Sequence, residues 1–181
     1  LTMGEKSQLT TIGKYTFGNT TKLVNVTLGP NLKTLGFCAF YGATKLTSIT
    51  IPKSVTLMDE YCLSNCSTLT NVNFETGGTE GLTIKQYAFR STKIVEITFP
   101  ARLIKAYDMV EETYLVGSWK SFNRLFYSNT VLAAIHVEEG GEYFASKEGI
   151  LYEVNMDGVA DILLFCPPAK TGDVTIPKEV R

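Results

Sequence analysis

Apolar residues recur along this chain with a period of about 23 residues. The anchors Phe17, Phe40 and Leu63 stand at the same place in three successive copies, and Phe89 marks a fourth copy after the longer turn Thr76–Gly81. Each anchor is followed by the string Leu/Ile-x-x-Val/Ile-x-Leu/Ile/Phe, which covers residues 23–28, 46–51, 69–74 and 94–99. Self-similarity at a fixed period of this length predicts a repeat protein in which each copy is one structural unit.

Within each copy the alternation Val/Ile-x-Leu/Ile has a period of two residues, which predicts a short strand with every second side chain buried. The segment Ile12–Phe17 and its counterparts are expected to cross back through a short strand and a short helical or irregular turn. One copy cannot bury its apolar side alone, whereas stacked copies bury it against each other. We therefore expect a strand-rich solenoid with a parallel strand ladder along one face.

The fifth copy is interrupted. Its first anchor, Ile104, and its aromatic anchor, Phe126, lie much farther apart than Ile12 and Phe17 do in the first copy, so roughly 17 extra residues are present. This insert covers 105–125. N-cap patterns at Asp108–Glu111 and at Ser118, the latter before Trp119, predict two short helices there.

A hairpin is predicted after the fifth copy. The strand-like runs 149–154 and 160–165 flank Asn155–Gly158, which is a strong turn signal. We expect a hairpin insert over 138–173. A last partial copy, Val174–Val180, begins where the sequence stops, so residues 1–181 are interpreted as a single solenoid cut from a longer array.

These motifs resemble the BspA-like, or Treponema-type, leucine-rich repeats. Leu46–Pro52, Leu35–Gly36 and Ala39–Phe40 match that family's consensus, and 143–172 resembles its recurrent hairpin insert, with Glu148 and Ala169 in place of Asp and Gly. The resemblance implies a right-handed α/β leucine-rich-repeat solenoid. It also implies a protein that is displayed or secreted by host-associated bacteria or by parasitic protists, and that adheres to host or microbial proteins.

Composition narrows the possible partners and cofactors. The formal net charge is -1 and 19% of the residues are charged. The chain therefore lacks the excess of basic residues that binding to nucleic acid requires. No apolar run approaches the roughly 20 residues of a membrane span. No Cys/His pairs have metal-ligand spacing, so we predict no metal and no cofactor. We interpret the four cysteines as buried free thiols. A disulfide or a zinc site remains an alternative for Cys38, Cys62, Cys66 and Cys166.

The outward positions of the predicted strands form two rows of polar side chains, which are candidates for a partner surface. A regular ladder of amide and hydroxyl groups suits an extended protein or a glycan, although the rows lack aromatic residues. The alternative is that these side chains only solvate the sheet. The candidates are Asn25, Ser48, Asn71 and Glu96 in one row and Thr27, Thr50, Asn73, Thr98 and His136 in the other.

The insert in the fifth copy is a second candidate surface because it concentrates aromatic residues. Exposed Trp and Tyr side chains are typical anchors of interfaces. The alternative is that these rings cover the flank of the solenoid and fill its core. The candidates are Tyr107, Tyr114, Trp119 and Phe122.

Repeat architecture favours a non-catalytic module that binds a protein partner. The resemblance to the BspA-like repeats implies that the module is extracellular or on the cell surface and that the partner is, for example, a host extracellular or plasma protein. One alternative is a structural spacer within a larger surface protein. A glycan-active enzyme is a further alternative. His136 is the only histidine, and no nucleophile motif accompanies it, so the sequence gives the enzyme the least support.

Overall fold

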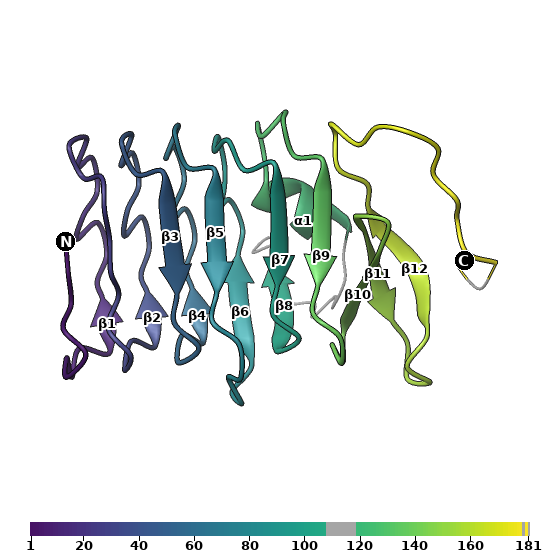
Figure 1. The fold of residues 1–181 in the computed structure, drawn as a ribbon, viewed down its shortest axis with the longest axis horizontal. Coiled ribbons are helices and arrows are strands. Elements are labelled where there is room, and N and C mark those ends of the chain that lie inside the picture. The colour runs from purple at the N-terminus through teal and green to yellow at the C-terminus, as the bar shows by residue number, and fades with distance from the viewer. Residues whose placement is uncertain (108–118, 179, 181) are drawn as a thin grey trace.

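The computed structural model describes residues 1–107, 119–178 and 180. The chain winds as a stack of similar turns along one axis, from the N-terminal turn at one end to a small antiparallel sheet near the other (Figure 1). The strand-rich solenoid with parallel strands and a repeat of about 23 residues is therefore confirmed. No helix in the described part of the chain has the length and apolarity needed to cross a bilayer.

The first segment of each copy forms one flank of the stack. Its strands make a five-stranded parallel sheet in the order in which they occur along the chain. These strands are short, because each turn contributes only a few extended residues before the chain bends. The strands are β1 (Thr11–Ile12), β2 (Thr34–Leu35), β4 (Leu57–Met58), β6 (Leu82–Lys85) and β8 (Leu103–Tyr107).

The second segment of each copy forms the opposite flank, so the parallel strands occupy two flanks, not one. Strand β3 (Ser48–Ile51) pairs with β5 (Asn71–Phe74), and β7 (Glu96–Phe99) pairs with β9 (Ala134–Val137). Burial alternates along β3 and β7 as the period of two predicts. The corresponding segment of the first copy makes only an isolated bridge, between Thr27 and Thr2.

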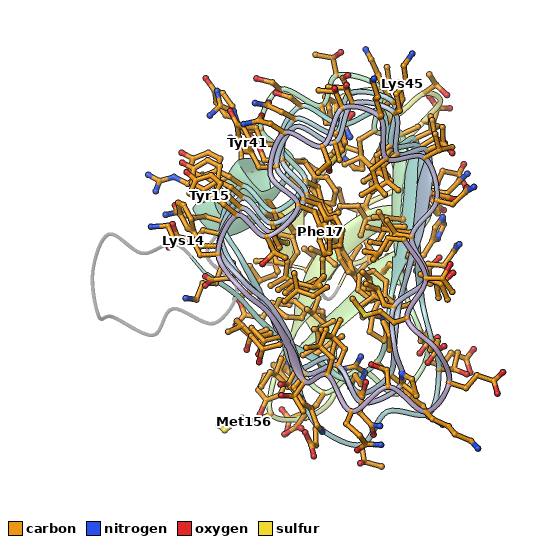
Figure 2. The ribbon with its side chains drawn as sticks, turned by 90° about the vertical axis from the view of Figure 1, so that its left-hand side faces the viewer. Lys14, Tyr15, Phe17, Tyr41, Lys45 and Met156 are labelled. Carbon is orange, nitrogen blue, oxygen red and sulfur yellow. The ribbon has the colours of Figure 1, made fainter. Side chains whose placement is uncertain are left out.

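The core lies between the two flanks and is filled by the repeated anchors. The side chains of Phe40, Leu63 and Phe89 are each 0% exposed. Phe17, in the first turn, points inward (Figure 2) and stacks on Phe40 with ring centroids 5.1 Å apart. Removing such a buried ring typically destabilises a protein by about 3–5 kcal/mol. Each turn is therefore stabilised mainly by its neighbours.

In the first four copies the crossing segments are irregular turns, not helices, and backbone hydrogen bonds link each of these turns to the next. The N–H of Phe17 donates to the Ala39 oxygen at 2.8 Å, and the N–H of Phe40 donates to the Cys62 oxygen at 2.8 Å. The chain reaches this geometry through two left-handed positions per turn. Residues with positive φ there include Tyr15, Asn19, Cys38, Gly42, Tyr61, Asn65, Tyr87 and Ser91.

The interrupted fifth copy contains helix α1 (Trp119–Leu125), which agrees with the second predicted helix. The first predicted helix, beginning near Asp108, lies outside the described residues. The predicted hairpin is present as β11 (Ile150–Val154) and β12 (Ala160–Phe165), and β10 (Phe144–Lys147) adds a third antiparallel strand. The division into inserts at 105–125 and 138–173 stays a prediction.

Candidate functional site

Two rows of polar side chains lie on the flank formed by β3, β5, β7 and β9, and they are in register within the pairs β3–β5 and β7–β9. Ser48 stands beside Asn71 and Thr50 beside Asn73, as Cα partners in adjacent strands. Every member is exposed except His136, which is half-buried. We call this surface the sheet face, and it consists of Asn25, Thr27, Ser48, Thr50, Asn71, Asn73, Glu96, Thr98 and His136.

The ladder beneath the sheet face is interrupted at its centre. Among the described strands, β5 pairs only with β3 and β7 pairs only with β9. A shallow depression of about 190 Å³ lies where β5 and β7 meet. Its lining combines amide, hydroxyl and carboxylate groups from Asn71, Val72, Asn73, Phe74, Glu96, Thr98 and Glu138. The expected continuous ladder is thus divided into pairs, with an acidic hollow between two of them.

The two carboxylates in this hollow have no cation among its lining residues. One oxygen of Glu138, Oε2, accepts a hydrogen bond from the backbone N–H of Ala101 at 3.3 Å, which ties that side chain to the turn after β7. Glu96 is exposed on β7. The hollow therefore presents acceptors and suits a partner that brings hydrogen-bond donors or a positive charge.

His136 lies on β9 in register with Thr98 on β7. Within the described ranges, no group of three or more His, Cys, Asp or Glu side chains is placed to hold a metal ion. The position of His136 within a row of hydroxyl and amide groups is that of a surface residue on a sheet.

The structure corrects the interpretation of Phe122 as a surface anchor. Its side chain is 0% exposed. Its ring meets Phe144 edge to face at a centroid distance of 5.3 Å and Phe99 at 6.5 Å. Helix α1 carries Phe122 on the side that faces the core, where an apolar ring gains most by leaving water. The ring fills the core, as the alternative interpretation held.

The other aromatic candidates of the insert stay predictions. Tyr107 ends strand β8 and Trp119 begins helix α1, and for both the structure describes the backbone alone. Tyr114 lies outside the described residues.

Sequence reasoning missed a line of aromatic rings on the flank opposite the sheet face. Neighbouring rings are separated by centroid distances of 5.6, 5.9, 4.9 and 6.1 Å from one turn to the next. Tyr15 is 50% exposed and Tyr127 51%, and the side chain of Tyr15 points outward, away from Phe17 (Figure 2). We call this surface the aromatic strip, and it consists of Tyr15, Phe37, Tyr61, Tyr87 and Tyr127.

Part of the aromatic strip had a signal in the sequence. Tyr15, Tyr61 and Tyr87 each stand two residues before the anchor of their copy. All three have φ between 55° and 59°, a left-handed conformation that is uncommon for residues other than glycine. Phe37 and Tyr127 come from other positions of the repeat, so only the stacking of turns brings them into line.

The cysteines are free thiols in the structure. Cys38, Cys62 and Cys66 are buried, as expected, but Cys166 is exposed. Burial raises the pKa of the Cys66 thiol to about 12 and raises the pKa of Cys62 well above its ordinary value. A buried neutral thiol behaves as a small apolar side chain, so these residues belong to the core.

The repeats of this chain match those of a known protein family. The model for the "BspA type leucine rich repeat region" matches residues 4–110, with six copies. The chain belongs to this family. None of the curated proteins compared with the chain matches it.

Solved structures with the same fold include the pneumococcal vaccine antigen PcpA, with a TM-score of 0.72 and 23% identity, covering 96% of this chain and 38% of that one. A leucine rich cell surface protein from Faecalibacterium prausnitzii has a TM-score of 0.68 and 23% identity, with coverages of 96% and 41%. A leucine-rich repeat protein from Eubacterium ventriosum has a TM-score of 0.50 and 17% identity, with coverages of 83% and 40%. The BspA-type chain thus spans about two fifths of their lengths.

Proposed function

We propose that this chain is a non-catalytic module, secreted or displayed on a cell surface, that binds a protein partner through the sheet face. The partner class is a host extracellular or plasma protein, or a protein of another microbe, so that binding produces adhesion. The observation that carries the proposal is that polar side chains in register on the pairs β3–β5 and β7–β9 border the acidic hollow between β5 and β7.

The geometry of the sheet face supports recognition of an extended partner. Parallel neighbours such as Ser48 and Asn71 repeat their polar groups at about 4.8 Å, the spacing of adjacent strands. Because these side chains project from a backbone held by strand pairing, little additional ordering is needed when a partner binds. The hollow lined by Glu96 and Glu138 offers acceptors at the centre of the surface.

A location outside the cell is supported by the structural neighbours. One carries the description of a leucine rich cell surface protein and another that of a vaccine antigen. Those descriptions apply to proteins in which a segment of this size is about two fifths of the whole, so we extend them to this chain as part of the proposal.

The test uses the purified chain against an array of purified mammalian extracellular-matrix and plasma proteins. We expect at least one saturable partner, with affinity reduced about tenfold by the double variant Asn71→Ala with Asn73→Ala. The matched control is Thr21→Ala with Ser67→Ala, at exposed polar positions that are not part of the sheet face. A partner that is unaffected by the first pair would contradict this site, and the lack of any saturable partner would favour a structural spacer.

A further inference from the structure

The aromatic strip has the features of a second interaction surface. Its rings are already packed against one another, so their conformations need little ordering when a ligand binds. Tyrosine and arginine dominate the energetics of protein interfaces because they combine a large apolar area with a polar group. The strip carries four tyrosines and one arginine, Arg90, and its first tyrosine, Tyr15, lies on the flank turned away from the sheet face (Figure 2).

Two cations lie over the rings of the strip, one near each end. Lys14 Nζ is 4.9 Å from the ring centroid of Phe37 and 5.8 Å from that of Tyr15. Arg90 Cζ is 5.4 Å from the centroid of Tyr127 and 5.9 Å from that of Tyr87. These contacts hold the cations in place through attraction to the ring faces.

Neither cation has a carboxylate partner within the part of the chain that the structure describes. The ion pairs there join Lys33 to Glu80 and Lys85 to Asp59. Glu60 is closer to the middle of the strip, beside Tyr61, where its charge acts on that ring. The strip is therefore positive near its two ends, with a negative charge between them.

We infer that the aromatic strip binds an extended acidic segment of a partner protein. The segment places one carboxylate at Lys14 and a second at Arg90, with neutral or apolar residues between them beside Glu60. Lys14 and Arg90 are three turns apart, which is roughly 14 Å at the spacing of adjacent strands. An extended chain covers that distance in about four residues, so the expected pattern is Glu-x-x-x-Glu.

The packing of the rings favours a peptide over a sugar chain. Tyr61 and Tyr87 stack on each other at 4.9 Å with an interplanar angle of 18°, and Lys14 and Arg90 occupy faces of the other rings. A pyranose that stacks on an aromatic side chain needs a free ring face. The strip instead offers ring edges, which carry positive partial charge, together with phenol hydroxyls and cations. Carboxylates and aliphatic side chains meet those groups directly.

The Arg90 end of the strip also provides an apolar recess. Tyr127 borders a depression of about 510 Å³ at the junction between the fifth copy and strand β12. Its lining includes Phe126, Tyr127, Leu163, Phe165, Cys166 and Pro168. A segment that continues past its second carboxylate would place an apolar side chain there, which gives the peptide a direction along the strip.

The experiment measures fluorescence polarisation of labelled peptides Glu-x-x-x-Glu-x-Leu, with x varied as a mixture, against the whole chain. A matched set carries Gln in place of both Glu residues. We expect saturable binding of the acidic set, weakened about tenfold in the Gln set and about tenfold by Lys14→Gln with Arg90→Gln. The affinity should fall as the salt concentration rises, because the ion pairs between the peptide carboxylates and the two cations are near the surface. The control pair Lys45→Gln with Lys53→Gln removes the same charge at exposed positions elsewhere.

Several outcomes would overturn the inference. Equal binding of the Glu and Gln sets, or an equal loss with the Lys45 and Lys53 pair, leaves no role for the two strip cations. Loss with Asn71→Ala and Asn73→Ala in place of the strip pair would assign the peptide to the sheet face. Binding of heparin but not of the peptides would make the occupant an acidic glycan. If the double variant of Lys14 and Arg90 fails to fold, the single variant Lys14→Gln, at an exposed position, must still weaken peptide binding.

The inference rests on the proposed function only in assigning a protein partner. An array partner that depends on Asn71 and Asn73, with no peptide binding, would uphold the sheet face and reject the strip. Peptide binding that depends on Lys14 and Arg90, with no array partner, would uphold the strip and reject the sheet face.

Discussion

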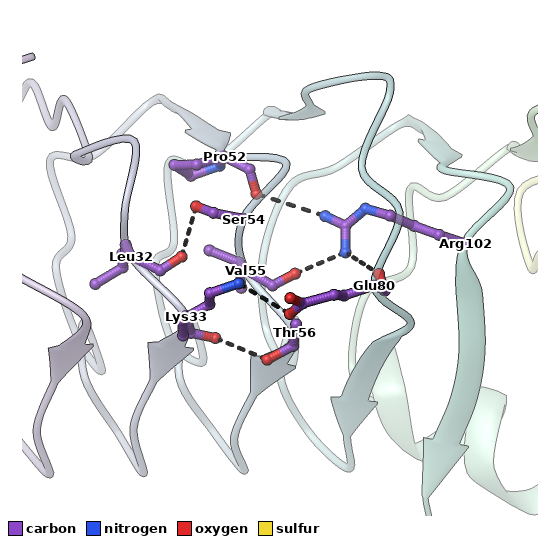
Figure 3. Close-up of polar contacts among 8 residues, drawn as sticks. All are labelled: Leu32, Lys33, Pro52, Ser54, Val55, Thr56, Glu80 and Arg102. Atoms are coloured by element: carbon purple, nitrogen blue, oxygen red, sulfur yellow. Dashed lines mark hydrogen bonds and ion pairs between the residues drawn. The ribbon is translucent and has the colours of Figure 1, made fainter.

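The Nη1 atom of Arg102 donates a hydrogen bond of 2.7 Å to the backbone oxygen of Val55, 47 residues earlier in the chain. The same guanidinium group reaches the backbone oxygens of Glu80 at 3.3 Å and Pro52 at 3.5 Å (Figure 3). Partial burial lowers the pKa of Arg102 from its ordinary value. One side chain thus fastens the longer turn before β6 to the turns on either side of it.

Arg102→Met should lower the free energy of unfolding by about 1–3 kcal/mol, because it leaves backbone carbonyls in a partly buried site without their donor. Urea denaturation measures this directly. Lys53→Met, which removes an exposed cation from a neighbouring turn, is the control and should change stability by less than about 0.5 kcal/mol. Equal losses for the two variants would show that the carbonyl contacts are unimportant.

Gly36→Ala should be much more damaging than Gly13→Ala, although both glycines hold the same position of the repeat. A Cβ on Gly36 would meet the Ile12 oxygen at 2.8 Å and the Gly13 carbon at 3.0 Å, both backbone atoms of the preceding turn. A Cβ on Gly13 meets only Thr16 Oγ1, at 3.5 Å. We expect a loss of about 1–3 kcal/mol for the first variant, as for other overpacked sites. Similar thermal unfolding of the two would argue against this close stacking.

The native chain should be alkylated at Cys166 long before the three buried thiols. Near pH 8 the pKa of Cys66, raised by burial to about 12, keeps it in the unreactive thiol form, and Cys38 and Cys62 are also buried. Mass spectrometry after brief iodoacetamide treatment should find one modified cysteine in the folded chain and four in urea. Modification of Cys66 as fast as Cys166 would be inconsistent with the burial of Cys66 in the core.

The free energy of unfolding should fall in alkaline solution, because the Cys66 thiol ionises more readily in the unfolded chain than in the folded one. The pKa of Cys66 is raised in the folded chain to about 12 from an ordinary value of 9.0. Its contribution is therefore complete below pH 9 and is lost as pH rises from there toward 12, by at most about 1.4 kcal/mol per pH unit. Cys66→Ala should have a flatter dependence of unfolding free energy on pH than the parent chain. An unchanged slope would contradict the burial of this thiol as the cause.

The fold could be predicted from the sequence because its repeat positions carry their own signal. Ile49 and Ile51 alternate with Ser48 and Thr50, and a period of two suffices to place a strand and its buried side. The longer turn before β6 was visible as a spacing change. The hairpin around Asn155 and Gly158 was likewise encoded by local turn chemistry.

The surface was less predictable because it depends on contacts between turns. The break between β5 and β7 arises from pairing, which no single copy specifies. Phe37 and Tyr127 join the aromatic strip from positions that differ from those of Tyr15 and Tyr61, so aligning the copies does not reveal the line of rings. Phe122 looked like an interface anchor because its residue type suits both an interface and a core, and only its packing against Phe144 distinguishes them.

Amide hydrogen exchange of the chain, with and without its array partner, would show whether the partner binds at the sheet face. If the partner covers the sheet face, amide exchange should slow in β5 (Asn71–Phe74) and β7 (Glu96–Phe99), which border the acidic hollow. Protection confined to β10, β11 and β12, with β5 and β7 unchanged at saturation, would contradict binding at the sheet face.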